Sequence, residues 1–222
     1  MYYPHPDPRL QQLFKAKPFQ GAEPGSAQFL FFGLDANFDP AIGTKPYFGE
    51  IESYLENGPR YWRERGFHHP FLHPEYRGHG ASYHRRFAGI GFRPEHAEQV
   101  AFVELIELAT YGTSRLRRSD LSPTHLQRLA RWVLEGNASV VFMPPNVVSL
   151  LCKTDEFGWL KADPDDLEGP LKVVFRSSAK LIVSPFHFSY YGRGYTKPER
   201  EAQIAAIRRL TIDAGTPSDR RP

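Results

Sequence analysis

The fold of this chain is decided by residues 29–38, which read FLFFGLDANF. The first four residues are apolar without alternation, which is typical of a strand covered on both faces of a sheet. Gly33 then allows a tight turn, and Asp35 follows directly. We therefore expect a buried strand over residues 29–34 that carries Asp35 to the mouth of the sheet.

Similar short apolar runs recur along the chain and predict the rest of the sheet. They are bounded by turn residues and rich in Val, Ile, Leu or Phe, as expected for parallel strands. The predicted strands lie at residues 100–105, 139–143 and 180–184, with a shorter or edge strand at 171–175.

Helical patterns separate these strands. Ser122-Pro123 begins one helix, which stops at Gly136, because serine and proline favour a helix start and glycine favours a stop. Residues 196–199, TKPE, begin another with the spacing of a capping box. Alternating strands and helices indicate an α/β fold, with three α/β/α layers around a central, mostly parallel sheet of four to five strands.

The chain of 222 residues predicts one α/β domain over residues 1–214 and a flexible polar tail over residues 215–222. Residues 48–92 fit this scheme least well, because they are unusually rich in histidine, arginine and aromatic residues. We expect this insertion to form helices at 51–57 and 83–88, joined by an irregular segment on the site side of the sheet.

Composition excludes several classes of protein. The longest apolar runs fall short of the roughly 20 residues that span a bilayer, and no secretory signal is visible at the start. Cys152 is the only cysteine, so an internal disulfide or a site of several thiolates is excluded. We expect a soluble cytoplasmic monomer without a membrane partner. The formal charge of +3 says little about partners.

Polar side chains follow each of the four main strands. Asp35 follows the first strand and Glu104 lies at the end of the second, while Asn146 and His187 follow the third and fourth. In open α/β sheets, ligands bind outside the carboxyl ends of the strands. If the first and last strands run side by side, these groups share one cleft, and their coincidence favours a site. The alternatives are structural: a helix cap for Asp35, and an ion pair with Arg115 or Arg117 for Glu104.

The order of these parts resembles the uracil-DNA glycosylase superfamily over residues 29–210. In that family, a first strand ends in a glycine-x-aspartate or asparagine motif, a second carries a base-reading residue, and a late histidine-containing loop enters DNA. The matching segments are residues 33–37 (GLDAN), 102–105 (FVEL) and 184–189 (SPFHFS), with residues 83–92 resembling the helix and turn before the second strand.

The resemblance implies a DNA glycosylase that takes a base out of the helix and hydrolyses its N-glycosidic bond without a cofactor. A carboxylate near the sugar would stabilise the oxocarbenium-like cation, and a donor near the base would stabilise the departing anion. The implied catalytic residues are Asp35 and His187. The implied base-binding residues are Asn37, Phe38, Phe48 and Glu104, and the implied DNA contacts are Ser184, Phe188, Ser189, Arg193 and Arg115, with Phe188 as the wedge in the vacated stack.

Two departures from the family pattern concern specificity. Glu104 stands where the uracil enzymes have an asparagine, which both donates and accepts hydrogen bonds. Glu104 would suit uracil only if burial kept it protonated; otherwise it favours a base edge with donors. Ser184 stands where the last motif begins with histidine, unless His187 is the equivalent.

A metal site is not expected. His69 and His73 have the spacing of metal ligands on a helix, but Pro70 and Pro74 interrupt the segment. We expect the histidines of residues 68–84 to lie on the surface or in a lid.

Two other functions remain open from the sequence. The chain could be a diverged member of the family that binds nucleic acid without cleaving it. It could also be a hydrolase or transferase of small nucleosides or nucleotides, because this sheet architecture supports many chemistries.

Overall fold

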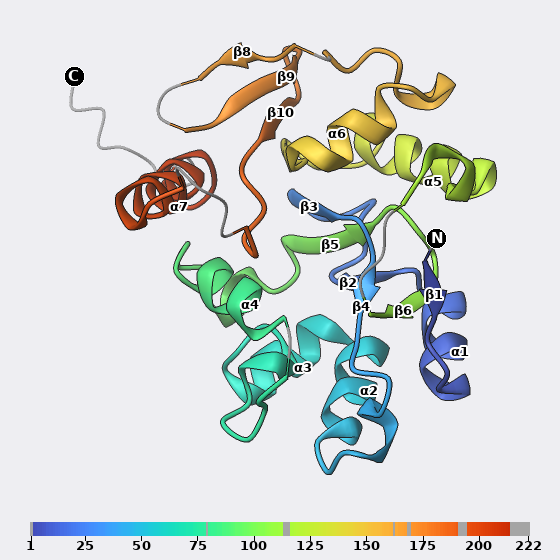
Figure 1. Ribbon diagram of the computed structural model, residues 1–222. Coiled ribbons are helices and arrows are strands. Elements are labelled where there is room, and N and C mark those ends of the chain that lie inside the picture. Colours follow the sequence, from blue (N-terminus) through green and yellow to red (C-terminus); the bar gives the residue numbers. More distant parts are fainter. Residues whose placement is uncertain are drawn as a thin grey trace.

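The computed structural model describes residues 2–78, 80–112, 116–161, 163–167, 170–190 and 195–213. In this part, the chain is a mixed α/β protein built around a seven-stranded sheet with the order β2-β5-β3-β7-β10-β9-β8 (Figure 1). Its strands are β2 (Phe19–Gly21), β3 (Phe29–Gly33), β5 (Val100–Glu104), β7 (Val140–Phe142), β8 (Asp165–Asp166), β9 (Lys172–Arg176) and β10 (Leu181–Ser184).

The five strands expected from the sequence are all present, but the sheet is larger and less parallel than expected. Strands β5, β3, β7 and β10 pair in parallel at its centre. The outer pairings β2–β5, β10–β9 and β9–β8 are antiparallel, so a mostly parallel sheet of four to five strands is not confirmed. Only residues 177–180 join β9 to β10, which is too short for a parallel crossover. The expectation that the first and last main strands are neighbours is wrong, because β7 lies between β3 and β10.

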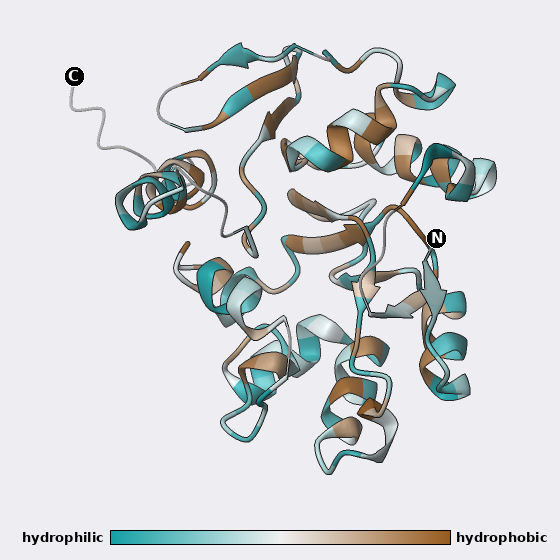
Figure 2. Ribbon diagram, viewed as in Figure 1, coloured by the Kyte–Doolittle hydropathy of each residue, from teal (hydrophilic) through white to brown (hydrophobic). Residues whose placement is uncertain are grey.

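Helices cover both faces of the sheet. Leu30 and Phe32 of β3 face a cluster that includes α5 (Pro123–Leu134) and α6 (Pro145–Leu151). Phe29 and Phe31 face the opposite cluster, with α4 (Ala81–Ala88) and α7 (Lys197–Thr211). Apolar residues on both faces explain the lack of alternation in this strand (Figure 2). Burial of each such side chain contributes about 1.5–3 kcal/mol.

The helix starts read from the sequence are confirmed. The side chain of Ser122 accepts a hydrogen bond from the His125 backbone N–H at the start of α5. Thr196 and Glu199 form the expected capping box at the start of α7. These local signals were sufficient because each cap depends only on residues within one helical turn.

The insertion packs below one end of the sheet, around a third hydrophobic cluster (Figure 1). Its α2 spans Phe48–Glu56, not 51–57, and α4 starts two residues before the expected 83. A further helix, α3 (Gly58–Arg65), was not expected; Asn57 caps it and Gly66, with φ of 76°, ends it. The cluster also holds α1 (Pro8–Ala16) and a small sheet of β1 (Tyr3–Pro4), β6 (Ala109–Tyr111) and β4 (Ala36–Asn37).

Short 3-10 helices complete the chain at Ile42–Thr44, Pro70–Leu72, Pro94–His96, Arg118–Asp120 and Asp155–Phe157. No helix within the described ranges is long and apolar enough to cross a membrane. Arg115, Arg193, His79 and the predicted tail at 215–222 lie outside the described residues.

Candidate active site

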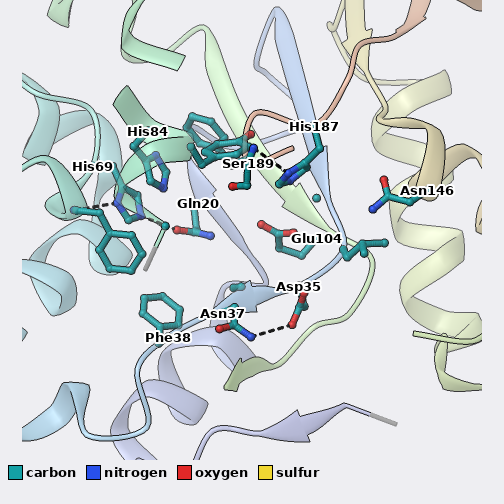
Figure 3. Close-up of a pocket in the computed structure, with 17 residues that line it drawn as sticks. Gln20, Asp35, Asn37, Phe38, His69, His84, Glu104, Asn146, His187 and Ser189 are labelled. Atoms are coloured by element: carbon teal, nitrogen blue, oxygen red, sulfur yellow. Dashed lines mark hydrogen bonds between the residues drawn. The ribbon is translucent and has the colours of Figure 1, made fainter. Parts of the chain in front are cut away.

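A cavity of about 370 Å³ opens at the carboxyl ends of β3 and β5 (Figure 3). Asp35, Glu104, Asn146 and His187 all line it, although they come from four different strand ends. The expectation that these four groups share one cleft is therefore confirmed, despite the strand that separates β3 from β10. The volume lies within the roughly 300–1,000 Å³ typical of small-ligand sites.

Asp35 is held from one side by its neighbours in the small sheet. Its Oδ2 atom accepts hydrogen bonds from the Thr110 hydroxyl and from Asn37 Nδ2, the latter at 3.4 Å. The same Asn37 amino group donates to the Gly112 carbonyl at 2.6 Å. Asn37 thus positions the carboxylate, and Oδ1 has no hydrogen-bond partner among the described residues. One carboxylate oxygen remains available to a ligand or a water molecule.

Glu104 is the last residue of β5 and lies opposite Gly33 of β3 in the parallel register. A Cβ atom on Gly33 would lie 2.2 Å from Glu104 Oε2, so the glycine makes room for this carboxyl group. Oε2 is buried and has no hydrogen-bond partner in the described part of the chain.

The surroundings of Glu104 set its protonation state. Burial raises the pKa of Glu104 to about 8, and the negative charge of Asp35 adds to the effect. At neutral pH the side chain is therefore a carboxylic acid, with one O–H donor and one carbonyl acceptor. From the sequence, protonation of Glu104 by burial was the condition for binding uracil. The raised pKa meets this condition, so the side chain can both donate and accept a hydrogen bond.

His187 lies in the loop after β10, against the Tyr83 ring at 5.2 Å between centroids. Burial lowers the pKa of His187 to about 4; Asp35 opposes this shift and Arg86 adds to it. Its Nδ1 atom accepts a hydrogen bond from the Ser189 backbone N–H at 3.2 Å. The neutral ring consequently carries its proton on Nε2, which makes it a neutral donor.

The loop that carries His187 is fixed at two points. Gln203 of α7 accepts a hydrogen bond from the Phe186 backbone N–H at 2.8 Å and donates to the Phe186 carbonyl at 2.9 Å. Arg86 of α4 donates to the carbonyls of Phe188 and Tyr190. Helices on either side of the loop thereby hold His187 over the cavity.

The insertion lies on the site side of the sheet, as expected, and contributes a second wall whose histidines were not assigned to the site from the sequence. His69 and His84 line the cavity with Gln20, and His68 lies directly behind His84. His68, His69 and His84 are at most 9% exposed, so the expectation of surface or lid histidines is wrong for them. The enclosing aromatic residues explain this burial, and their abundance around residues 67–71 was the available signal. The described ranges contain no group of three or more His, Cys, Asp or Glu side chains arranged to hold a metal ion.

Three expected site residues do not line this cavity. Phe48 is buried in the cluster of the insertion, under the Arg9 guanidinium at 4.6 Å, and so does not reach a base. Ser184 is buried at the end of β10 and lines a separate hollow beside α6. Phe188 is only 5% exposed and packs against Tyr83 and Phe87, so it is a core residue and not a wedge.

Other expected residues are at the cavity. Asn37, Phe38 and Ser189 line it, with Phe38 buried and in edge contact with Phe71 at 5.6 Å. Among the described residues of the same loop, the exposed aromatic side chains are Phe186 and Tyr190, which stack with an angle of 11° between their rings. The expected DNA contacts of Arg115 and Arg193 fall outside the described residues.

No model of a known protein family matches this chain, and no match was found among curated proteins.

Proposed function

We propose that this protein is a DNA-base glycosylase of the uracil-DNA glycosylase type, which removes a deaminated or damaged base. The observation that carries the proposal is the pair of carboxyl groups in one cavity. Asp35 is held by the Thr110 hydroxyl and Asn37, and Glu104 is kept as a neutral acid by burial. Carboxyl groups in one site with different environments are the pattern expected when one acts on the reacting centre and the other donates a hydrogen bond.

The arrangement of the sheet supports the same proposal. The four central strands are parallel in the order β5-β3-β7-β10, with helices over both faces. That core corresponds to the three-layer α/β/α arrangement that the sequence resemblance implies. Asp35 and His187, two and three residues after the ends of β3 and β10, are the residues to which the resemblance would give the catalytic roles, and their common cavity supports the proposal.

In the proposed mechanism, the sugar of the extruded nucleotide lies beside Asp35. The bond between C1′ and the base nitrogen breaks, and its electron pair leaves with the base. The Asp35 carboxylate stabilises the oxocarbenium-like sugar and accepts a proton from the water that attacks C1′. The departing base receives a hydrogen bond from Nε2 of neutral His187 and finally acquires the proton released by the water.

Exposed aromatic residues next to His187 supply a candidate wedge. Phe186 and Tyr190 are 41% and 43% exposed and lie on either side of His187 in the chain. An aromatic ring can fill the space that an extruded base leaves in the stack. We assign this role to Phe186 and Tyr190 in place of the buried Phe188.

The test is release of free base from DNA duplexes that contain uracil, hypoxanthine or xanthine, with undamaged duplexes as controls. We expect release from at least one modified duplex and none from the controls. Salt-dependent DNA binding without release would instead support a binding protein. Cleavage of free nucleosides but not of DNA would support a small-molecule hydrolase. Either result would contradict the proposal.

A further inference from the structure

Gln20 enters the cavity from the edge strand β2 and not from a strand end. It pairs with Phe102 of β5, is only 7% exposed, and lines the cavity together with Glu104. A buried primary amide carries two donors and one acceptor, and each needs a partner or a ligand. Which end of this amide faces the cavity therefore decides what it can bind.

His69 fixes the orientation of that amide. Its Nδ1 atom accepts a hydrogen bond from the Phe71 backbone N–H at 3.1 Å, so the ring proton lies on Nε2. Nε2 lies 3.2 Å from Gln20 Oε1 and donates to it. The oxygen of the amide is thus occupied, and its amino group Nε2 has no partner among the described residues. Figure 3 shows Gln20 between His69 and Glu104, with its amino nitrogen on the Glu104 side.

The imidazole ring of His69 is held firmly in this orientation. It stacks on His84 with 3.6 Å between centroids and 8° between planes, and the Tyr54 ring lies edge-on at 4.6 Å. His84 is hydrogen-bonded in turn to His68 at 3.0 Å. Burial holds the pKa of His69 well below its ordinary value, so the neutral tautomer persists at neutral pH.

From this geometry we infer that Gln20, oriented by His69, reads the base. Its amino group would donate to a ring carbonyl, while Glu104 pairs with the neighbouring ring N–H. The two residues together select bases with a carbonyl beside an N–H, as in uracil and hypoxanthine, over cytosine and adenine. This inference rests on the proposed function, and it names the substrate class of that site.

The same geometry rejects bases that carry an amino group in place of that carbonyl. Cytosine and adenine would place an N–H₂ group against the Gln20 amino group, so that two buried donors face each other. A buried donor left without an acceptor weakens binding by roughly tenfold to a hundredfold. The site would therefore distinguish uracil from cytosine, and hypoxanthine from adenine, by the atom that deamination replaces.

The test measures the binding of free bases by the full chain, which does not require cleavage of DNA. Uracil is compared with cytosine, and hypoxanthine with adenine, by titration calorimetry or ligand-observed NMR. For the wild-type protein we expect a preference of at least about tenfold for the deaminated base of each pair. Gln20→Met, of similar size but without hydrogen-bonding groups, should lose most of that preference. Gln127→Met, on the exposed side of α5, is the matched control and should keep it.

His69→Phe tests the positioning role separately. With the amide free to rotate, this variant should lose the preference between bases while it still binds them. A purely structural role would instead lower the affinity for all four bases equally. Thermal unfolding of each variant shows whether it is folded.

Two results would overturn the inference: equal wild-type affinity for uracil and cytosine, or an unchanged preference in folded Gln20→Met. Failure of the proposed function would give a different experimental result from failure of this inference. A preference that depends on Gln20, with no base release from DNA, would contradict the glycosylase and leave the reading role intact. Base release with a preference independent of Gln20 would contradict only the reading role.

Discussion

Glu104 is the residue at which the sequence and the structure together are most informative. The sequence has a glutamate where the uracil enzymes that it resembles have an asparagine, and the structure shows its carboxyl group buried beside Gly33. A protonated carboxyl group has the same donor and acceptor as a primary amide along one edge. Under the proposed function, Glu104 could thus read a base as the asparagine does, provided that the proton stays in place.

This dependence on a proton gives a pH prediction. The pKa of Glu104 is raised to about 8, so base release should be fastest below about pH 7 and fall as the pH rises through 8, because an ionised Glu104 would place a second negative charge beside the departing anionic base. Burial raises the pKa of the neighbouring Tyr83 and Tyr54 and lowers that of His187, so none of these groups titrates near pH 8. Glu104→Gln should keep activity on the deaminated base without the alkaline fall, because an amide does not titrate. The measurement is the rate of base release from pH 6 to 9.5.

A wild-type rate that does not fall near pH 8, or an identical fall in the Gln variant, would show that Glu104 does not face the base as an acid. A stability measurement provides an independent control. Between the ordinary pKa of 4.5 and the folded-state value of about 8, only the folded state holds this proton. Glu104 therefore lowers stability as the pH rises through this range, and Glu104→Gln should remove that dependence.

At the scale of elements, the loop after β10 shows that the position of an aromatic residue in the sequence does not reveal whether its side chain is exposed. The wedge expected from the sequence was Phe188, because no local pattern shows which side chain of an irregular loop turns into the core. The structure places Phe188 in the core beside Tyr83 and leaves Phe186 and Tyr190 at the surface.

Replacement by alanine should mainly affect activity at the exposed aromatic residues and mainly affect stability at the buried one. Phe186→Ala and Tyr190→Ala should change the free energy of unfolding by less than about 0.5 kcal/mol, as exposed sites do. Each should weaken activity on duplex DNA by roughly tenfold, in line with the stacking of a base on an aromatic ring. Leu134→Ala, at an exposed apolar residue of α5, is the control and should affect neither quantity.

Phe188→Ala should instead cost about 3–5 kcal/mol of stability, because it opens a cavity in the core. Denaturant unfolding and base release from duplex and single-stranded DNA separate the two effects. Full activity of the Phe186→Ala/Tyr190→Ala double variant on duplex DNA would contradict the wedge role.

The elements also show which parts of the fold can be predicted from the sequence. Strand β3 and helices α5 and α7 follow from signals within a few residues: unbroken apolar runs, caps and a glycine stop. Helix α3 was missed because its Gly58-Pro59 start has the composition of a turn, although proline is favoured in a first helical turn. Strands β2 and β8 are too short to have a pattern, and only their pairing to β5 and β9 defines them.

At the scale of the whole molecule, part of the site could likewise be predicted from the sequence and part could not. Asp35, Glu104, Asn146 and His187 were predicted together because the topology of an α/β sheet gathers strand ends at one edge. Gln20 and the buried histidines depend on contacts between residues 49 and 16 positions apart in the chain. No local pattern encodes such contacts.

The buried histidines predict how the stability of the molecule depends on pH. Burial lowers the pKa of His68 to about 3 and of His187 to about 4, and it lowers those of His69 and His84 well below their ordinary value. Above about pH 6.5 both folded and unfolded states hold these rings neutral. Below it, only the unfolded state binds protons, so stability is lost as the pH falls, by up to about 1.4 kcal/mol per pH unit for each ring.

We therefore expect the free energy of unfolding to decrease between pH 7 and 5.5, although Glu104 acts in the opposite direction. Denaturant titrations over this range measure the slope. His68→Phe should reduce the slope, and His73→Gln, outside the buried group, should leave it unchanged. A free energy of unfolding that does not change with pH, or equal slopes for both variants, would contradict the assignment of neutral buried rings.

The most direct test of the central claim compares wild type with Asp35→Asn in single-turnover release of a deaminated base from duplex DNA. Asparagine preserves the shape of the side chain but cannot stabilise the cation or accept a proton. We expect the rate to fall by about a hundredfold or more while the affinity for the same duplex changes little. Equal rates for the two proteins, or no release by folded wild-type protein, would contradict the account.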